Sequence, residues 1–125
     1  CNLRKVVPLK HALTNYDVWI TRIRRKQTQA RSHAELVELE PRFEVIKINP
    51  LINWTHDEVW DYIKRHNLPY NVLHDQQYPS IGCKQCTSPV CDGDDDRSGR
   101  WKGLNKTECG LHQSNNIAIN GFKGK

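Results

Sequence analysis

The pattern of apolar and polar positions predicts two strands and a short helix in the first part of the chain. Residues 17–23 (Asp-Val-Trp-Ile-Thr-Arg-Ile) are rich in β-branched and aromatic side chains, which is typical of a buried strand. Residues 43–49 have the same character and end before Pro50, so they predict a second strand. A short helix is expected over 9–14, because Pro8 breaks any helix that begins before it and suits a first helical position.

The most clearly marked helix begins at Thr55. Thr55 is the expected N-cap, and Glu58, three residues further on, completes a capping box. The apolar stripe of this helix consists of Val59, Trp60 and Ile63, with Tyr62 on its flank. Asn67 and Pro69 predict its end.

The remaining segments show weaker patterns. Residues 34–39 predict a short helical turn. Beyond residue 69, prolines and glycines interrupt the pattern and predict loops. Residues 84–112 are expected to form a structured loop region, and residues 113–125 a mobile tail.

The composition bounds the size and class of the protein. With 125 residues the chain fits one small domain or part of a larger one. No apolar run reaches about 18 residues, so we expect no membrane span, and the start of the chain predicts no secretory signal. The absence of methionine, with Cys1 already inside a motif, predicts that the chain is an internal fragment of a longer protein.

The five cysteines indicate cytosolic metal binding or catalysis, because a secreted disulfide scaffold prefers an even number. Cys83 and Cys86 have the two-residue spacing found in zinc sites, iron–sulfur clusters and redox dithiols, and Gly82 permits a tight backbone before them. Buried structural thiols are the alternative. Cys1 and Cys91 are candidates for further ligands.

Cys109 stands apart from the other cysteines and has the setting of a nucleophile. Gly110 leaves its thiol accessible, and a nearby His112 favours the reactive thiolate. An inert cysteine on a C-terminal tail is the alternative.

The net charge of +5 suits an anionic small molecule, a nucleic acid or an acidic partner protein. Arg97 and Arg100 stand three residues apart, and arginine forks pair with phosphate or sulfate through two hydrogen bonds. Neutralisation of the neighbouring aspartates is the alternative. Lys5, beside Arg4, either balances the charge of a thiolate-bound cluster or belongs to a solvated basic surface.

Taken together, these motifs resemble the assimilatory adenylylsulfate (APS) reductases, the iron–sulfur branch of the PAPS/APS reductase family. The resemblance covers about residues 1–114. It is carried by Cys1-Asn2-Leu3-Arg4-Lys5-Val6, Trp19-Ile20-Thr21-Arg22-Ile23-Arg24-Arg25, Asn49-Pro50-Leu51, Asp57-Glu58-Val59-Trp60, Leu68-Pro69-Tyr70-Asn71, Ser80-Ile81-Gly82-Cys83, Arg97-Ser98-Gly99-Arg100-Trp101 and Lys106-Thr107-Glu108-Cys109-Gly110-Leu111-His112.

The resemblance implies a fold and a reaction. The fold is an adenine nucleotide α-hydrolase-like α/β domain, with a parallel sheet flanked by helices. In the reaction, the thiolate of Cys109 attacks the sulfur of APS and displaces AMP, which leaves an enzyme S-sulfocysteine. A thioredoxin or glutaredoxin dithiol then releases sulfite.

The resemblance also assigns roles to single residues. It implies a [4Fe-4S] cluster bound by Cys1, Cys83 and Cys86, together with a cysteine directly ahead of Cys1. His112 lies beside the nucleophile in the family. The residues that match family positions near the substrate are Lys5, Arg24, Arg97 and Arg100.

The family comparison predicts two parts. Residues 1–90 are expected to be the C-terminal part of the nucleotide-binding α/β domain, and residues 91–125 a loop-rich catalytic segment. The family's upstream phosphate-binding loop has no counterpart in this sequence. Cys91 has none in the family pattern, and Arg22 stands where a glycine is common.

Other readings remain open. The same family includes PAPS reductases, and a zinc-binding nucleic-acid module would use Cys83, Cys86, Cys91 and Cys109 as ligands. The leading reading expects a cytoplasmic enzyme that binds neither nucleic acid nor membrane, and it allows a homo-oligomer.

Overall fold

The computed structural model describes residues 2–106, 108–112 and 117–119, so the predicted cluster ligand Cys1 lies outside the described residues. The chain forms two compact units. Unit 1 contains the residues up to 59 and those from 108 onward, and unit 2 contains residues 60–107. The fold class is mixed α/β, as predicted, with its sheet in unit 1. The predicted boundary at residue 90 stays a prediction.

Unit 1 opens with a π-helical turn, Asn2–Val6, that leads directly into helix α1, Val7–Leu13. The short predicted helix is therefore confirmed, with Pro8 in its first turn. The expectation that Pro8 breaks any preceding helix is wrong. Proline lies here at the start of α1, where a backbone N–H has no intrahelical acceptor, so its missing donor costs nothing.

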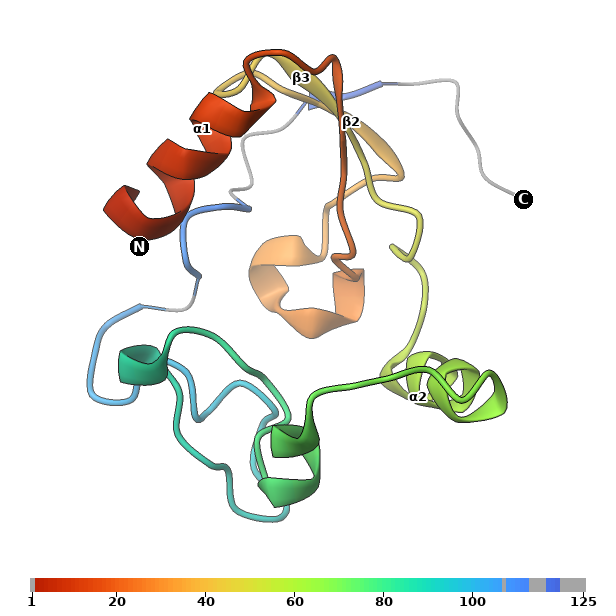
Figure 1. Cartoon of the computed structure of the whole chain (residues 1–125), viewed down its shortest axis with the longest axis vertical. Helices are drawn as coiled ribbons and strands as arrows, with labels where there is room; N and C mark the ends of the chain where they lie inside the picture. The colour runs from red at the N-terminus through yellow and green to blue at the C-terminus, as the bar shows by residue number, and fades with distance from the viewer. Residues whose placement is uncertain (1, 107, 113–116, 120–125) are drawn as a thin grey trace. The chain divides into compact units, whose positions relative to one another are not determined.

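A four-stranded sheet follows α1 (Figure 1). Its strands are β1 (Val18–Ile20), β2 (Val37–Glu40), β3 (Val45–Ile48) and β4 (Ile117–Ala118), in the order β1-β3-β2-β4. β1 pairs with β3 in parallel, whereas β2 is antiparallel to both β3 and β4. The sheet is thus mixed, where the family resemblance led us to expect a parallel one.

The helical turn predicted over 34–39 is wrong, because residues 34–36 form no regular element and the residues from 37 onward belong to β2. Read with a period of two, its side chains alternate between the faces of the sheet: Glu38 and Glu40 are buried, and Leu39 is exposed. Buried glutamates conflict with a strand prediction from sequence, but each of these has a basic partner, Lys47 for Glu38 and Arg42 for Glu40. Tertiary pairing therefore overrides the local helical preference.

The two faces of the sheet differ in how far they are buried. The inner face packs on α1 through a core of Leu13, Phe43 and Val45, with Trp19 partly buried against it. The outer face exposes an apolar row of Val18, Leu39, Ile46 and Ile117, which are aligned across the four strands. The prediction of a strand at 17–23 is confirmed, but its burial is wrong, since Val18 and Ile20 are 41% and 68% exposed.

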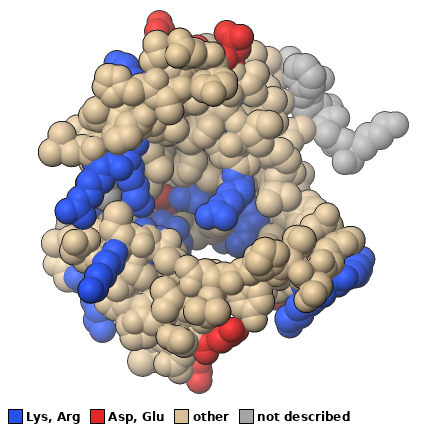
Figure 2. Space-filling view, viewed as in Figure 1, with Lys and Arg blue, Asp and Glu red and all other residues tan. Residues whose placement is uncertain are grey.

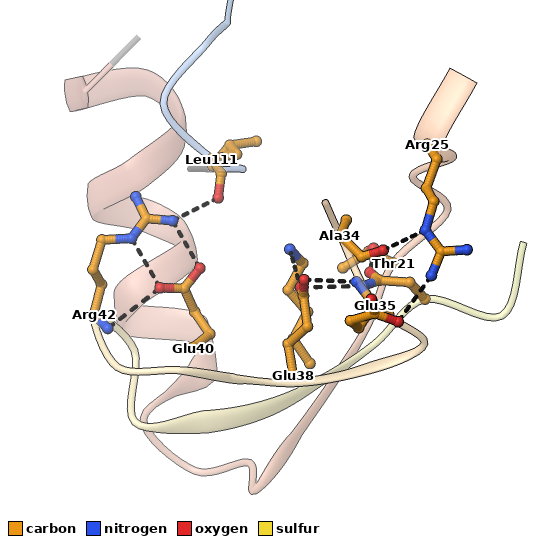
Figure 3. Close-up of polar contacts among 10 residues, drawn as sticks. Thr21, Arg25, Ala34, Glu35, Glu38, Glu40, Arg42 and Leu111 are labelled. Carbon is orange, nitrogen blue, oxygen red and sulfur yellow. Dashed lines mark hydrogen bonds and ion pairs between the residues drawn. The ribbon is translucent and has the colours of Figure 1, made fainter. Parts of the chain in front are cut away.

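A buried polar network lies on the inner face, close to the ends of β1 and β3. The ammonium of Lys47 lies 3.0 Å from Glu38 Oε2. The two side chains are almost fully buried, with exposed fractions of 2% and 5%. Asn49 also donates to Glu38, at 3.2 Å, and accepts from the hydroxyl of Thr21 (Figure 3). Every buried charge here is paired, as burial in a low-dielectric interior requires.

Helix α2, His56–Arg65, confirms the strongest helix prediction. The backbone N–H of Thr55 donates to Glu58 Oε2 at 2.7 Å, and the N–H of Glu58 donates to the Thr55 hydroxyl at 3.2 Å. The N–H and the hydroxyl of Thr55 both donate to Glu58 Oε2, at 2.7 and 2.9 Å, and these two bonds, with the positive charge of Lys26, hold the pKa of Glu58 below its usual value. Asn67 takes a left-handed conformation just after the helix, where the sequence predicts its end.

Unit 2 consists mainly of loops, as predicted for residues beyond 69. Its regular pieces, apart from its share of α2, are the 3₁₀ turns Val72–Gln76 and Lys84–Cys86 and a bridge between Thr87 and Arg100. The predicted mobile tail, 113–125, is wrong at 117–118, which form β4; the rest lies outside the described residues except residue 119. No helix among the described residues is long and apolar enough to cross a membrane.

Candidate active site

Cys109 lies in unit 1, on a short segment of irregular backbone, and is half-buried. The residue before it, Glu108, is held by two side chains from the loop that follows β1. Arg31 Nη2 lies 2.9 Å from Glu108 Oε2, and the Thr28 hydroxyl donates to Oε1 at 3.0 Å. The side chains of Arg31 and Glu108 are only 10% and 12% exposed, so this ion pair is largely shielded from water.

The residues after Cys109 are held by Arg42, which lies in the turn after β2, whereas Arg31 lies ahead of this strand. The guanidinium of Arg42 donates to the backbone carbonyls of Gly110, at 2.8 Å, and Leu111, at 2.9 Å. Figure 3 shows the same guanidinium facing the carboxylate of Glu40. Gly110 has φ of +85°, a conformation that glycine adopts without strain.

His112, the residue that the sequence places beside the nucleophile, stacks on Trp19 of β1. The two ring centroids are 5.3 Å apart and the rings are inclined by only 11°. Trp19 in turn meets Phe43 of the core edge to face. The structure therefore places His112 and Cys109 on one segment, and the role of His112 in favouring the Cys109 thiolate stays a prediction.

The predicted cluster cysteines Cys83 and Cys86 share one turn in unit 2, and both are half-buried free thiols. The N–H of Cys86 donates to the carbonyl of Cys83 at 2.9 Å. Thr87 closes the turn: its hydroxyl donates to the same carbonyl at 2.9 Å and accepts the N–H of Gly82 at 3.0 Å. This tight turn suits two thiolates that bind one metal centre.

The donor set for a metal is incomplete within the described part of the chain. There, no three His, Cys, Asp or Glu side chains gather closely enough to hold a metal ion. Cys91, which the zinc-module alternative uses as a ligand, is exposed. The pair therefore fits half of a four-cysteine site, and Cys1, its predicted companion, lies outside the described residues.

Arg97 and Arg100, the predicted anion ligands, both lie over the ring of Trp101. Their guanidinium carbons are 5.6 Å and 4.5 Å from its centroid. Arg100 also donates to the Ser80 hydroxyl and the Ile81 carbonyl, and its guanidinium occupies the space beside Gly82, where a Cβ would come within 2.2 Å of it. Arg100 thus supports the backbone that leads into Cys83.

The remaining predicted substrate residues lie in unit 1. Lys5 is half-buried in the π-helical turn Asn2–Val6, and the neighbouring Val6 faces Gly110, since a Cβ on Gly110 would lie 3.9 Å from Val6 Cγ2. Arg24 follows β1, as predicted, just before a 3₁₀ turn at Arg25–Gln27. Basic side chains predominate over acidic ones on the face shown in Figure 2.

Sequence reasoning missed Arg31, Arg42 and Glu40. Arg31 and Arg42 make contact with residues 77 and 68–69 positions away, so no local pattern reveals them. In the sequence, a glutamate two residues ahead of an arginine, as Glu40 is ahead of Arg42, is only a weak signal for an ion pair across a turn. The motif around Cys109 was recognised, but what holds it was not.

The structural class of the chain follows from its similarity to a solved structure. The chain is similar in structure to the phosphoadenylyl-sulfate (PAPS) reductase from Candida auris in its phosphate complex, with a TM-score of 0.59 and 36% identity. That similarity covers 71% of this chain and 41% of the other. The chain is therefore an α/β protein with the adenine nucleotide α-hydrolase-like fold.

The family follows from the sequence comparison. A model of the phosphoadenosine phosphosulfate reductase domain matches residues 1–89, and the chain belongs to this family. It is 58% identical over 113 residues to adenosine 5'-phosphosulfate reductase 2 of Bacillus subtilis (strain 168), covering 90% of this chain and 48% of that protein. It is 54% identical over 114 residues to adenosine 5'-phosphosulfate reductase of Anoxybacillus flavithermus (strain DSM 21510 / WK1), covering 91% and 48%. The chain thus spans about half the length of these curated relatives.

Proposed function

We propose that the whole protein reduces adenylylsulfate to sulfite and AMP, as a thioredoxin-dependent enzyme of assimilatory sulfate reduction. The observation that carries the proposal is the half-buried Cys109, held on a segment whose two sides are bonded to arginines from two loops of unit 1. A nucleophile needs this combination of access and defined position. Relatives at 53–58% identity that bear the name adenosine 5'-phosphosulfate reductase support the choice of substrate.

The proposed chemistry has two steps. The thiolate of Cys109 attacks the sulfur of the substrate, an S–S bond forms, and the bond from sulfur to the phosphate oxygen breaks to release AMP. A thiolate of thioredoxin or glutaredoxin then attacks Cys109 Sγ and displaces sulfite. The second thiol of that dithiol resolves the mixed disulfide, so the dithiol is oxidised by two electrons and the sulfonate sulfur is reduced to sulfite.

The proposal includes a [4Fe-4S] cluster held by Cys83 and Cys86, with Cys1 as a further ligand. The tight turn that carries Cys83 and Cys86 supports it. When bound, such a cluster would supply a negatively charged group, whose charge the cationic Lys5 would help to balance. A cytoplasmic location and a homo-oligomer belong to the same proposal.

The test is an assay of the whole protein, purified without oxygen, for sulfite release from APS and from PAPS with thioredoxin present. We expect sulfite from APS, together with iron and acid-labile sulfide in the protein. Sulfite from PAPS alone, without iron, would favour the cluster-free PAPS reductase. The absence of sulfite from both nucleotides would exclude the proposed reaction.

Substitution of Arg97 by alanine should weaken substrate binding. Loss of one charge-assisted contact to the phosphosulfate predicts a cost of about 1.5–3 kcal/mol, or roughly tenfold to a hundredfold in affinity. Isothermal titration with APS, in a Cys109→Ser background that prevents turnover, measures the effect. Unchanged affinity would return Arg97 to the role of neutralising the neighbouring aspartates.

Arg100→Ala provides a comparison within the same region. Because Arg100 also bonds to Ser80 and Ile81, its loss should additionally disturb the turn that carries Cys83. We therefore expect weaker binding together with lower iron content in Arg100→Ala, and weaker binding alone in Arg97→Ala.

A further inference from the structure

Glu40 is the starting point, because a fully buried carboxylate must be paired. The residue is 0% exposed and lies on the inner face of β2. Arg42, two residues further on, supplies a two-pronged partner: its Nε lies 2.9 Å from Oε1 and its Nη2 lies 2.8 Å from Oε2. The tight turn between β2 and β3 brings the two side chains together, so the guanidinium is held in one orientation.

The same guanidinium has donors left over, and these contact the Cys109 segment. Nη1 donates to the carbonyl of Gly110 and Nη2 to the carbonyl of Leu111. Its flat face lies over the ring of Phe43, with 5.0 Å between the guanidinium carbon and the ring centroid. One side chain therefore joins a buried acid, the core and the backbone just after Cys109, and Figure 3 shows its contacts with Glu40 and Leu111.

A second arginine holds the other side of Cys109. Arg31 is 9% exposed, pairs with Glu108 and also donates to the side-chain oxygen of Gln27. Arg31 and Arg42 come from different loops of unit 1, and they contact the residues on either side of the one cysteine. Neither contact involves the thiol itself.

We propose that Arg42, oriented by Glu40, is a positioning residue that fixes the Cys109 segment on the sheet, and that Arg31 does the same from the Glu108 side. Without Arg42 the two carbonyls lose a donor that is itself anchored, and the segment samples other conformations. A lysine at position 42 keeps the charge, but its three donors sit on one nitrogen, so it cannot make the four bonds that the Arg42 side chain makes from three nitrogens. The effect on activity rests on the proposed function of Cys109, whereas the effect on the segment's order does not.

The test measures order and activity separately in the whole protein. Amide hydrogen exchange, followed by mass spectrometry, reports on peptides that contain residues 108–112 and on peptides from β2 and β3. In Arg42→Ala and Arg42→Lys we expect exchange over 108–112 to accelerate about tenfold or more, because charged hydrogen bonds to the backbone are lost. Arg65→Ala, which removes an exposed arginine of α2, is the matched control and should leave this exchange unchanged.

Kinetics supply the second readout. If Arg42 positions Cys109, its variants should lower kcat about tenfold or more with KM for the nucleotide nearly unchanged, and Arg42→Lys should not restore kcat. A KM increase with unchanged kcat would instead place Arg42 in substrate binding and overturn the proposal. If the wild-type protein releases no sulfite, the proposed function fails, but the exchange measurement still decides the role of Arg42.

Unfolding is the competing explanation, and Arg42→Lys separates it from loss of position. Should Arg42→Ala accelerate exchange in β2 and β3 as well, the lysine variant, which keeps a positive charge beside Glu40, decides the outcome. Faster exchange confined to 108–112 in Arg42→Lys supports the proposal. Exchange as slow as in the wild-type protein overturns it.

Discussion

Replacement of Cys109 by serine in the whole protein should abolish sulfite formation and leave the iron content unchanged. A serine hydroxyl is protonated at neutral pH and is a far weaker nucleophile than a thiolate, so we expect kcat to fall by at least about 10⁴-fold. The fold of the segment should survive, because the contacts of Arg31 and Arg42 go to Glu108 and to backbone carbonyls rather than to the thiol.

The measurement is sulfite release from APS with a thioredoxin system, alongside iron analysis of the same preparation. Mass spectrometry adds a direct check: wild-type protein mixed with APS in the absence of thioredoxin should gain one sulfonate group on Cys109, and the serine variant should gain none. Cys91→Ser is the matched control, since Cys91 is exposed and has no counterpart in the family pattern. Sulfite release by the Cys109 variant at the wild-type rate would disprove the nucleophile assignment.

Replacement of Cys83 or Cys86 by serine should remove iron and activity together. The two cysteines lie on one turn, which is closed by a hydrogen bond from Cys86 N–H to the Cys83 carbonyl and by the Thr87 hydroxyl. No other thiol on this turn can replace the one that is lost. Thiolate ligands bind iron far more strongly than hydroxyls do, and loss of one ligand of four commonly releases an iron–sulfur cluster. We expect iron and acid-labile sulfide to fall to a small fraction of the wild-type amount.

Iron and sulfide analysis with a visible spectrum checks this second result, and Cys91→Ser again serves as the control that should keep its iron. Full iron retention in both single variants would move the ligand set away from this turn. Loss of iron from the Cys91 variant would show that the exposed cysteine is itself a ligand, contrary to the family pattern.

Local sequence signals were reliable where a short pattern has one physical solution. The capping box of Thr55 and Glu58 is such a case: two residues three apart satisfy each other's backbone donors, and α2 begins where they predict. The strand at 43–49 was likewise confirmed, because its β-branched side chains pack well on a pleated surface. The motifs around Cys83 and Cys109 also led to the family without any structural information.

Local signals failed where the stabilising partner is distant in sequence. Strand β2 carries two glutamates, Glu38 and Glu40, that look solvent-exposed in the sequence, and their pairing with Lys47 and Arg42 lets both be buried in a strand. The mobile tail predicted over 113–125 is wrong at Ile117 and Ala118 for the same reason, because these two residues form a strand by pairing with β2. The exposure of β1 is also a tertiary property, because it depends on which face α1 covers.

The sequence by itself determined which thiols stand in a two-residue pair, which thiol stands alone, and which family shares those motifs. The tertiary structure alone decided how the lone thiol is held. Arg42 and Arg31 reach the Cys109 segment across 68 and 77 residues of chain, and such contacts form only when the sheet and its loops bring distant charges together. A motif records which groups react, whereas the position of those groups depends on pairings that no local window contains.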